Sequence, residues 1–146
     1  MGAPVAIELI IVDNMGTNVE FQRRCVKRLE GLAGGDERKA KRAAQKLHSI
    51  VEGINEEGLK AEAGVLKAMS DPYRLTILKL LKEGERCVCE ITTALDRPQS
   101  STSHHLSILK SAGLIKERRV GKWSHYRISE GAVIDIMKLA EILAGK

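Results

Sequence analysis

The chain has 146 residues and a formal net charge of +5, and it is 43% hydrophobic but only 3% aromatic. This length suits one domain, or a small domain with an extension. A core made from Leu, Ile, Val and Ala favours helices. The apolar stretch 5–12 contains Glu8 and is too short to span a bilayer of about 30 Å. We expect no membrane anchor or targeting signal, and three cysteines, an odd number, predict reduced thiols in a cytoplasmic protein.

Residues 1–55 are predicted to form an N-terminal extension. Thr17 and Glu20 have capping-box spacing, and apolar residues then recur at helical spacing to residue 33. Asp36 is expected to cap a second amphipathic helix that ends near Ile54. We expect both helices to pack on the rest of the protein or on a partner protomer. Direct DNA contact through their basic faces is the less favoured interpretation.

Residues 56–146 are predicted to form the main domain, which opens with a helix from about Asn55 to Met69. Asp71 is a good N-cap and Pro72 fits the first position of the next helix, which Gly84 closes. The expected buried side of that helix is Leu75, Ile77, Leu78, Leu80 and Leu81.

The rest of the domain has the order of a winged helix-turn-helix. A short bracing helix over residues 87–95 is followed by a turn at 96–98 and a second helix over 99–112. The period then alternates over residues 114–128, which predicts a β-hairpin with its turn at Val120-Gly121. Ser129 is expected to cap a last helix. The predicted fold is mainly α with a small β-hairpin wing, and it works as a dimer.

The second helix of this pattern suits reading of double-stranded DNA. Small polar side chains at its start let the backbone enter a major groove about 12 Å wide. The expected base and phosphate contacts are Gln99, Ser100, Ser101, Ser103, His104 and His105, with Lys110 on phosphate. The hairpin adds a cationic ribbon that suits the DNA backbone, namely Lys116, Arg118, Arg119, Lys122 and Arg127 against the single acid Glu117. We expect no enzyme, since the chain lacks a phosphate loop, a His-Glu-x-x-His pair and a nucleophile–base set.

Four strings of this region closely resemble the ArsR/SmtB family of metal-responsive repressors. They are residues 66–75, 87–91, 99–106 and 109–115, and the resemblance covers residues 59–146 but not the extension. It implies a homodimer with the first and last helices of this region at the interface, and repression that an inducer relieves. It also implies DNA contacts by Gln99, Ser100, Ser103 and His104.

The resemblance further implies a thiolate site. Cys87 and Cys89 match the Cys-Val-Cys run that binds metal in arsenic- and cadmium-type members, so the expected inducer is trivalent arsenic, cadmium, zinc or a similar soft ion. A third cysteine of some members is Thr92 here, which leaves Cys25 as a substitute third ligand. The last helix contains no His, so the zinc site of other members is not expected there.

Helical geometry predicts how such a site would act. Residues i and i+2 lie about 200° apart on a helix, so one ion bound to Cys87 and Cys89 should unwind or displace the start of the bracing helix and weaken DNA binding. Two alternatives remain for the same DNA-binding repressor. One is oxidation of these thiols, and the other is a non-thiol ligand or partner bound to the extension.

Overall fold

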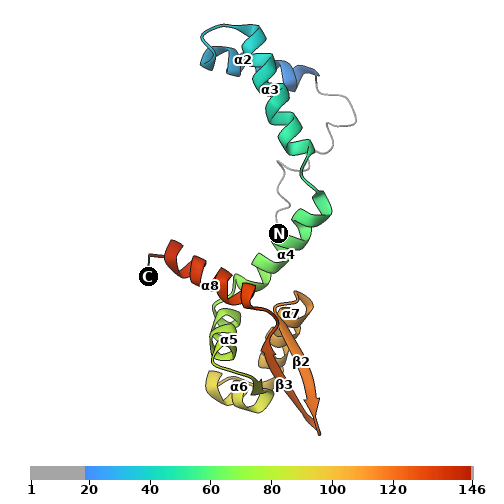
Figure 1. Ribbon diagram of the computed structural model, residues 1–146, viewed down its shortest axis with the longest axis vertical. Coiled ribbons are helices and arrows are strands. Elements are labelled where there is room, and N and C mark those ends of the chain that lie inside the picture. Colours follow the sequence, from blue (N-terminus) through green and yellow to red (C-terminus); the bar gives the residue numbers. More distant parts are fainter. Residues whose placement is uncertain (1–18, 146) are drawn as a thin grey trace. The chain divides into compact units, whose positions relative to one another are not determined.

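The structure is a computed structural model that describes residues 19–145. The chain divides into two compact units, Met1–Asn55 and Glu56–Lys146 (Figure 1). Within residues 19–145, every helix is too short or too polar to span a bilayer.

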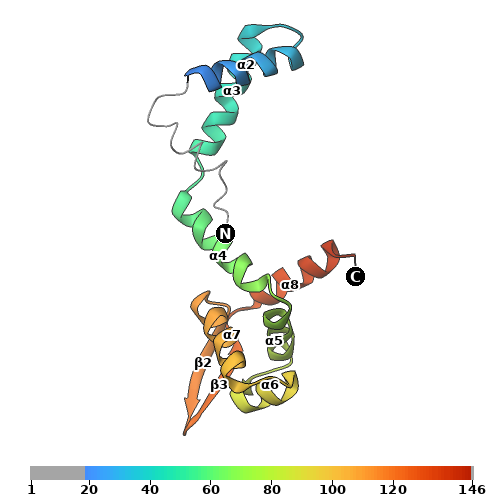
Figure 2. The ribbon, with the colours of Figure 1, turned by 180° about the vertical axis from the view of Figure 1, so that it is seen from behind.

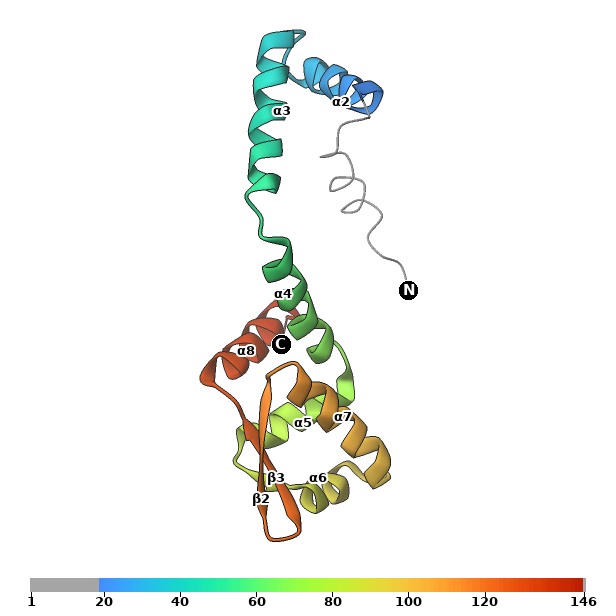
Figure 3. The same cartoon turned by 90° about the vertical axis from the view of Figure 1, so that its right-hand side faces the viewer.

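The first unit is a helical hairpin of α2 (Val19–Leu32) and α3 (Glu37–Glu52), visible at the blue end of the chain in Figure 3. Gly34 and Gly35 turn the chain with φ of +66° and +85°, a conformation that glycine adopts at little cost. The predicted cap is confirmed, because the Asp36 carboxylate accepts from the N–H of Arg38 and Lys39 at 3.0 and 3.2 Å. Thr17 of the predicted capping box lies outside the described residues.

The second unit contains five helices and a small sheet among its described residues. The helices are α4 (Glu56–Met69), α5 (Pro72–Lys82), α6 (Val88–Leu95), α7 (Gln99–Ser111) and α8 (Gly131–Leu143). The strands are β1 (Arg86–Cys87), β2 (Ile115–Val120) and β3 (Trp123–Ile128), antiparallel in the order β1-β3-β2. The predicted fold, mainly α with a β-hairpin wing, is confirmed.

The core of the second unit is aliphatic, as the composition predicts. Its most buried large side chains, all fully enclosed, are Ile77 and Leu78 of α5, Ile91 of α6, and Leu106 and Leu109 of α7. They lock the three helices together, and burying one such side chain contributes about 1.5–3 kcal/mol. Leu75 and Leu80, expected on the inward side of α5, are half-buried at its edge.

The helix-turn-helix and the wing follow directly from local sequence. Asp96 ends α6 in the left-handed region with φ of +49°, which Asp tolerates better than most residues. The hairpin turn lies at Gly121-Lys122, one residue later than predicted, because Val120 pairs with Trp123. α7 packs against β2, and the β2–β3 hairpin projects beyond the helices (Figure 2).

The predicted cap of the last helix is wrong. Glu130, with φ of −153°, is the N-cap of α8 and makes no side-chain capping bond. Ser129 still belongs to the strand exit, where its N–H donates to the Leu114 carbonyl at 3.0 Å. That bond closes the base of the hairpin, so the helix can begin only after it.

The capping of α5 gives a stability test. Asp71 accepts from the Arg74 N–H at 3.0 Å, so Asp71→Ala should lower the free energy of unfolding by about 1 kcal/mol. Asp71→Ser retains a capping oxygen without the charge and should recover most of this loss. Urea unfolding at one fixed protein concentration measures both variants. Equal destabilisation by Ala and Ser would show that the cap is not the cause.

Candidate nucleic-acid interface and thiol pair

The start of α7 presents polar side chains to solvent. Gln99, Ser100, Ser103 and His104 are exposed, whereas Thr102, Leu106 and Leu109 form the buried face of the same helix. Pro98 occupies the N-cap without a side-chain capping bond, so no capping side chain covers the first N–H groups of α7. A helix start of this kind can donate to a phosphate oxygen and also present side chains to base edges.

His105 and Ser101 differ from the expected exposed set. Both are half-buried, and the His105 ring stacks on Tyr73 of α5 with centroids 5.6 Å apart and planes 10° apart. The reason is periodicity, since His105 borders the buried stripe that contains Thr102 and Leu109. His105 therefore packs against α5 instead of standing free at the surface.

The Tyr73 ring also contacts the turn between α6 and α7. The Arg97 guanidinium carbon lies 4.4 Å from the Tyr73 ring centroid, so Tyr73 contacts both the turn and α7. The stack fixes the turn and the start of α7 relative to α5. Neither Tyr73 nor Arg97 belongs to the residues predicted for the site, and the scarcity of aromatic residues is the one feature of the sequence that points to Tyr73.

Two of the expected phosphate-binding cations are already paired with carboxylates. Lys110 Nζ lies 2.5 Å from Glu117 Oε2, and the Arg118 guanidinium Nε donates to both oxygens of Glu85 at 2.8 and 2.9 Å. These bonds hold the pKa of each carboxyl below its usual range, so both are charged at neutral pH. Glu85 lies 33 positions from Arg118 in the chain, so no local pattern in the sequence indicates that it pairs with a side chain of the wing.

Arg119 and Lys122 are the more available cations of the wing. Both are exposed near the hairpin turn, where Arg119 Nη1 donates to the Lys122 carbonyl at 3.4 Å. The Lys122 ammonium lies 5.3 Å from the Trp123 ring centroid. Among the described residues, neither has a carboxylate within ion-pair distance. These two side chains are available to contact the phosphates of a DNA backbone.

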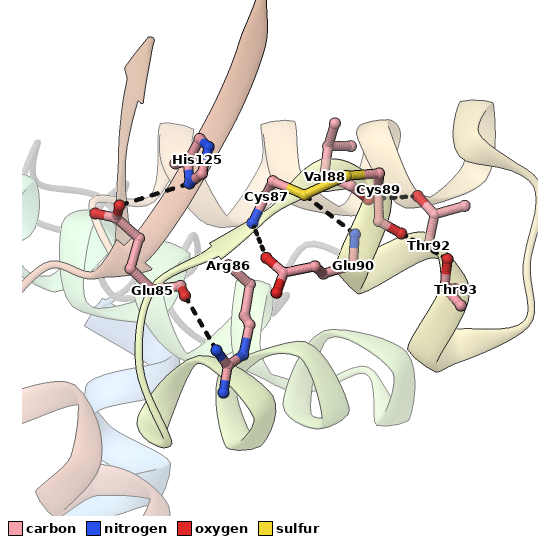
Figure 4. The surroundings of a disulfide bond; sticks show 9 residues. All are labelled: Glu85, Arg86, Cys87, Val88, Cys89, Glu90, Thr92, Thr93 and His125. Carbon is pink, nitrogen blue, oxygen red and sulfur yellow. Dashed lines mark hydrogen bonds and ion pairs between the residues drawn. A yellow bond between two sulfur atoms is a disulfide. The ribbon is translucent and has the colours of Figure 1, made fainter. Parts of the chain in front are cut away.

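The thiol pair differs from the prediction in a decisive way. Cys87 is not in the bracing helix: it is the last residue of β1 and the N-cap of α6, with extended φ and ψ of −76° and 159°. Its sulfur turns over the first turn of α6 and is joined to Cys89 by a disulfide, with Cα atoms 5.4 Å apart (Figure 4). Cys87 lies outside the helix, so the expected divergence of the two sulfurs along an intact helix is wrong. The effect of a bound ion on the start of α6 stays a prediction.

Cys87 caps α6 through a reciprocal pair of bonds. Its sulfur accepts from the Glu90 N–H at 3.3 Å, and the Glu90 carboxylate accepts from the Cys87 N–H at 2.7 Å. Cys87 is buried at 8% exposure, whereas Cys89 is exposed. Cys87 is thus enclosed and caps the helix, whereas Cys89 lies at the surface.

Cysteine sulfurs are the kind of ligand that a soft ion prefers, but the set of ligands is incomplete. Cys87 and Cys89 are joined to each other, and only after reduction to thiolates would the two sulfurs match the preference of thiophilic ions. Thr92 uses its hydroxyl within α6 to donate to the Val88 carbonyl at 2.7 Å. Cys25, the expected third ligand, is a half-buried free thiol in the first unit, beside a small cavity that His48 also lines. Across residues 19–145, no group of three His, Cys, Asp or Glu side chains is arranged to hold a metal.

Comparison with known proteins agrees with this architecture. Residues 71–117 match the family model described as "Bacterial regulatory protein, arsR family". The chain is 48% identical over 88 residues to an uncharacterised HTH-type transcriptional regulator of Methanocaldococcus jannaschii, covering 60% of this chain and 99% of that protein. It is also 48% identical over 66 residues to the arsenical resistance operon repressor of Escherichia coli, covering 44% of this chain and 56% of that repressor.

A solved structure extends the comparison to the fold. It is the homodimeric winged helix-turn-helix DNA-binding domain of a possible ArsR-family regulator from Mycobacterium bovis, with a TM-score of 0.58 and 36% identity. The match covers 64% of this chain and 89% of that domain. The order of elements, the exposed start of α7, the basic wing and these relatives lead to one conclusion: the chain belongs to the ArsR family of transcriptional regulators, and its second unit is a winged helix-turn-helix domain.

Proposed function

We propose that the protein is a DNA-binding repressor that binds a near-palindromic operator as a homodimer and leaves it when Cys87 and Cys89 react. The observation that carries this proposal is a single structural unit containing the exposed start of α7, the cationic wing and a thiol that caps α6. The function rests on the site and on the family together.

We assign recognition of the operator bases to α7, and positioning of the domain on the DNA backbone to the wing. Gln99 suits adenine N6 and N7, while Ser100, Ser103 and His104 suit phosphates or base edges. Arg119 and Lys122 suit phosphates on either side of the groove. Ser101 and His105, being half-buried, are proposed to support α7 and not to touch bases.

The proposed dimer interface lies on α4 and α8. These helices leave large apolar side chains exposed at 37–88%, namely Leu59, Leu66, Leu139, Ile142 and Leu143. Several large apolar side chains exposed on two helices indicate a surface that another protein chain covers. The homologous Mycobacterium bovis domain is homodimeric, which supports a second copy as that cover. Two such units read half-sites about one helical turn apart, near 34–36 Å.

The proposed inducer is a thiophilic ion. The Escherichia coli relative is named for arsenical resistance. Reduction of the Cys87–Cys89 disulfide would supply two neighbouring thiols, the ligands that trivalent arsenic, cadmium or zinc prefer. Cys87 and Cys89 would hold the ion, with Cys25 the proposed third ligand. Bound there, the ion would supply strong bonds to sulfur and release the two thiol protons.

Oxidation is a second candidate for the signal, and the disulfide between Cys87 and Cys89 is the observation that favours it. A hydroperoxide can oxidise the exposed Cys89 thiolate to a sulfenic acid, releasing an alcohol. The Cys87 thiol then displaces water from that sulfur. Overall, two thiols and one hydroperoxide give one disulfide, one alcohol and one water, so atoms and electrons balance.

The extension is proposed to add to the dimer. Beyond the part of α3 where Ala40 is buried, the end of that helix and the turn after it expose Leu47, Ile50, Val51 and Ile54 at 40–57%. Their spacing forms one stripe along the helix. A partner protomer would cover this stripe.

The DNA interface is tested with an operator that the full-length protein selects from random duplexes. Gln99→Ala should weaken operator binding by about 1–3 kcal/mol and relax one base preference, because a base contact is lost. Arg119→Ala should weaken binding to every sequence and reduce the salt dependence by about one phosphate contact per protomer. Fluorescence anisotropy over a salt series measures both, with Ser111→Ala at the far end of α7 as control. Unchanged operator affinity in both variants would place the interface elsewhere.

The thiol site is tested on reduced full-length protein under anaerobic conditions. Arsenite or cadmium should lower operator affinity about 100-fold, equivalent to about 2.7 kcal/mol. Cys87→Ser keeps a good capping residue and Cys89→Ser is an exposed change, so both should bind operator normally yet fail to respond. Thiolate-to-metal absorption should disappear in parallel. An intact response in both variants would exclude this site.

Two further measurements separate the inducers. Loss of the arsenite response in Cys25→Ser, with the oxidant response retained, would assign the third ligand to the extension. Reduced protein that binds no such ion at micromolar concentration but releases DNA after hydroperoxide treatment would select oxidation as the signal.

The role of the extension is tested by removing residues 1–54. The truncated protein should dimerise more weakly while its second unit keeps its helical content, because the apolar stripe of α3 is lost. Sedimentation equilibrium and circular dichroism measure the two quantities. The same dimer affinity and thermal midpoint as the full chain would show that the extension does not contribute to the dimer.

A further inference from the structure

Glu85 holds a wing cation at the base of the hairpin. Its carboxylate receives the Arg118 guanidinium through Nε at 2.8 and 2.9 Å and through Nη2 at 2.5 Å, and it also faces His125 Nδ1 at 3.6 Å. Arg118 is 61% exposed, whereas Glu85 is 24% exposed. The carboxylate is therefore fixed in place while the guanidinium remains within reach of solvent.

Glu85 is also connected to the thiol pair through the backbone. It directly precedes β1, whose two residues pair with β3 as Arg86 with Tyr126 and Cys87 with His125. One short strand thus carries the carboxylate at its entry and the capping thiol at its end, as Figure 4 shows. A movement of Cys87 is transmitted to Glu85 across a single intervening residue.

We propose that Glu85 is a latch that withholds Arg118 from DNA phosphate when Cys87 and Cys89 are joined. This inference rests on the proposed function, because it explains how the thiol state reaches the wing. In the disulfide form, the Cys87 sulfur is fixed over the first turn of α6, β1 is held against β3, and Glu85 keeps Arg118. In the dithiol form, Cys87 is freed from Cys89, β1 can shift, and Arg118 exchanges its carboxylate for a phosphate.

The exchange requires little energy. A carboxylate and a phosphate offer a guanidinium similar paired oxygens, so the two partners compete closely for Arg118. The guanidinium of this pair is open to solvent, and such ion pairs contribute little, so one phosphate contact can replace it. A strand of two residues also has few ladder bonds to resist the shift.

Glu117 provides a matched comparison on the other face of the hairpin. It pairs with Lys110 at 2.5 Å and accepts from the Ser124 hydroxyl at 2.6 Å, and its strand partner is Tyr126. These partners come from α7 and β3, not from β1. Neutralising Glu117 should therefore release a cation without altering the response to the thiols.

The experiment uses full-length protein in two forms, fully reduced and disulfide-oxidised, each verified by thiol titration and mass spectrometry. Operator affinity is measured by anisotropy at one fixed salt concentration. Wild type should bind more weakly when oxidised. Glu85→Gln should raise the operator affinity of the oxidised form about fivefold per protomer and change that of the reduced form much less. Glu117→Gln should shift both forms equally.

Arg118→Ala supplies an independent readout. It should weaken the reduced protein, which uses this contact, and leave the oxidised protein nearly unchanged. An oxidised-to-reduced affinity ratio in Glu85→Gln equal to that of wild type, or equal losses in both forms of Arg118→Ala, would overturn the latch while the proposed function stands. A wild-type affinity that responds to neither oxidant nor arsenite would overturn both.

Discussion

The structure depends on how α6 begins. An N-cap residue must leave the helical conformation and offer an acceptor to an unpaired N–H, and here a cysteine does both. Because Cys87 lies outside the helix, its sulfur can reach that of Cys89 while the helix remains intact. The residue proposed to react with soft ions or oxidants is thereby also the residue at which the bracing helix starts.

The position of that cap explains how a reaction at the Cys87 sulfur could change the affinity for DNA. α6 and α7 share the buried contacts of Ile91, Leu106 and Leu109, so the bracing helix and the reader helix are one packed body. Cys87 also belongs to β1, and through β3 it is connected to the wing. Cys87 is therefore connected to both proposed DNA-binding elements by different routes: through the packed body of α6 toward α7, and through the two-residue strand β1 toward the hairpin.

Much of the fold was predictable because its signals are local. Helical spacing, the caps at Asp36 and Asp71, and the alternation before Gly121 each operate within a few residues. Apart from the hairpin turn, which is one residue later than predicted, the errors come from contacts between distant segments. A two-residue strand has no periodicity to detect, so Cys87 was placed inside the helix, and Glu85 pairs with a residue 33 positions away. His105 was expected at the surface because nothing local indicates that Tyr73 lies against it.

Hydrogen exchange on the full-length protein tests the central claim most directly, since it follows α6 and β1 residue by residue in the dithiol and disulfide forms. If Cys87 acts from outside an intact helix, the amides of Ile91 to Leu95 keep their protection in both forms. The difference is then concentrated in the β1–β3 pair around Cys87 and His125. Loss of protection throughout α6 in either form, with β1–β3 unchanged, would contradict this account and would restore unwinding of the bracing helix as the switch.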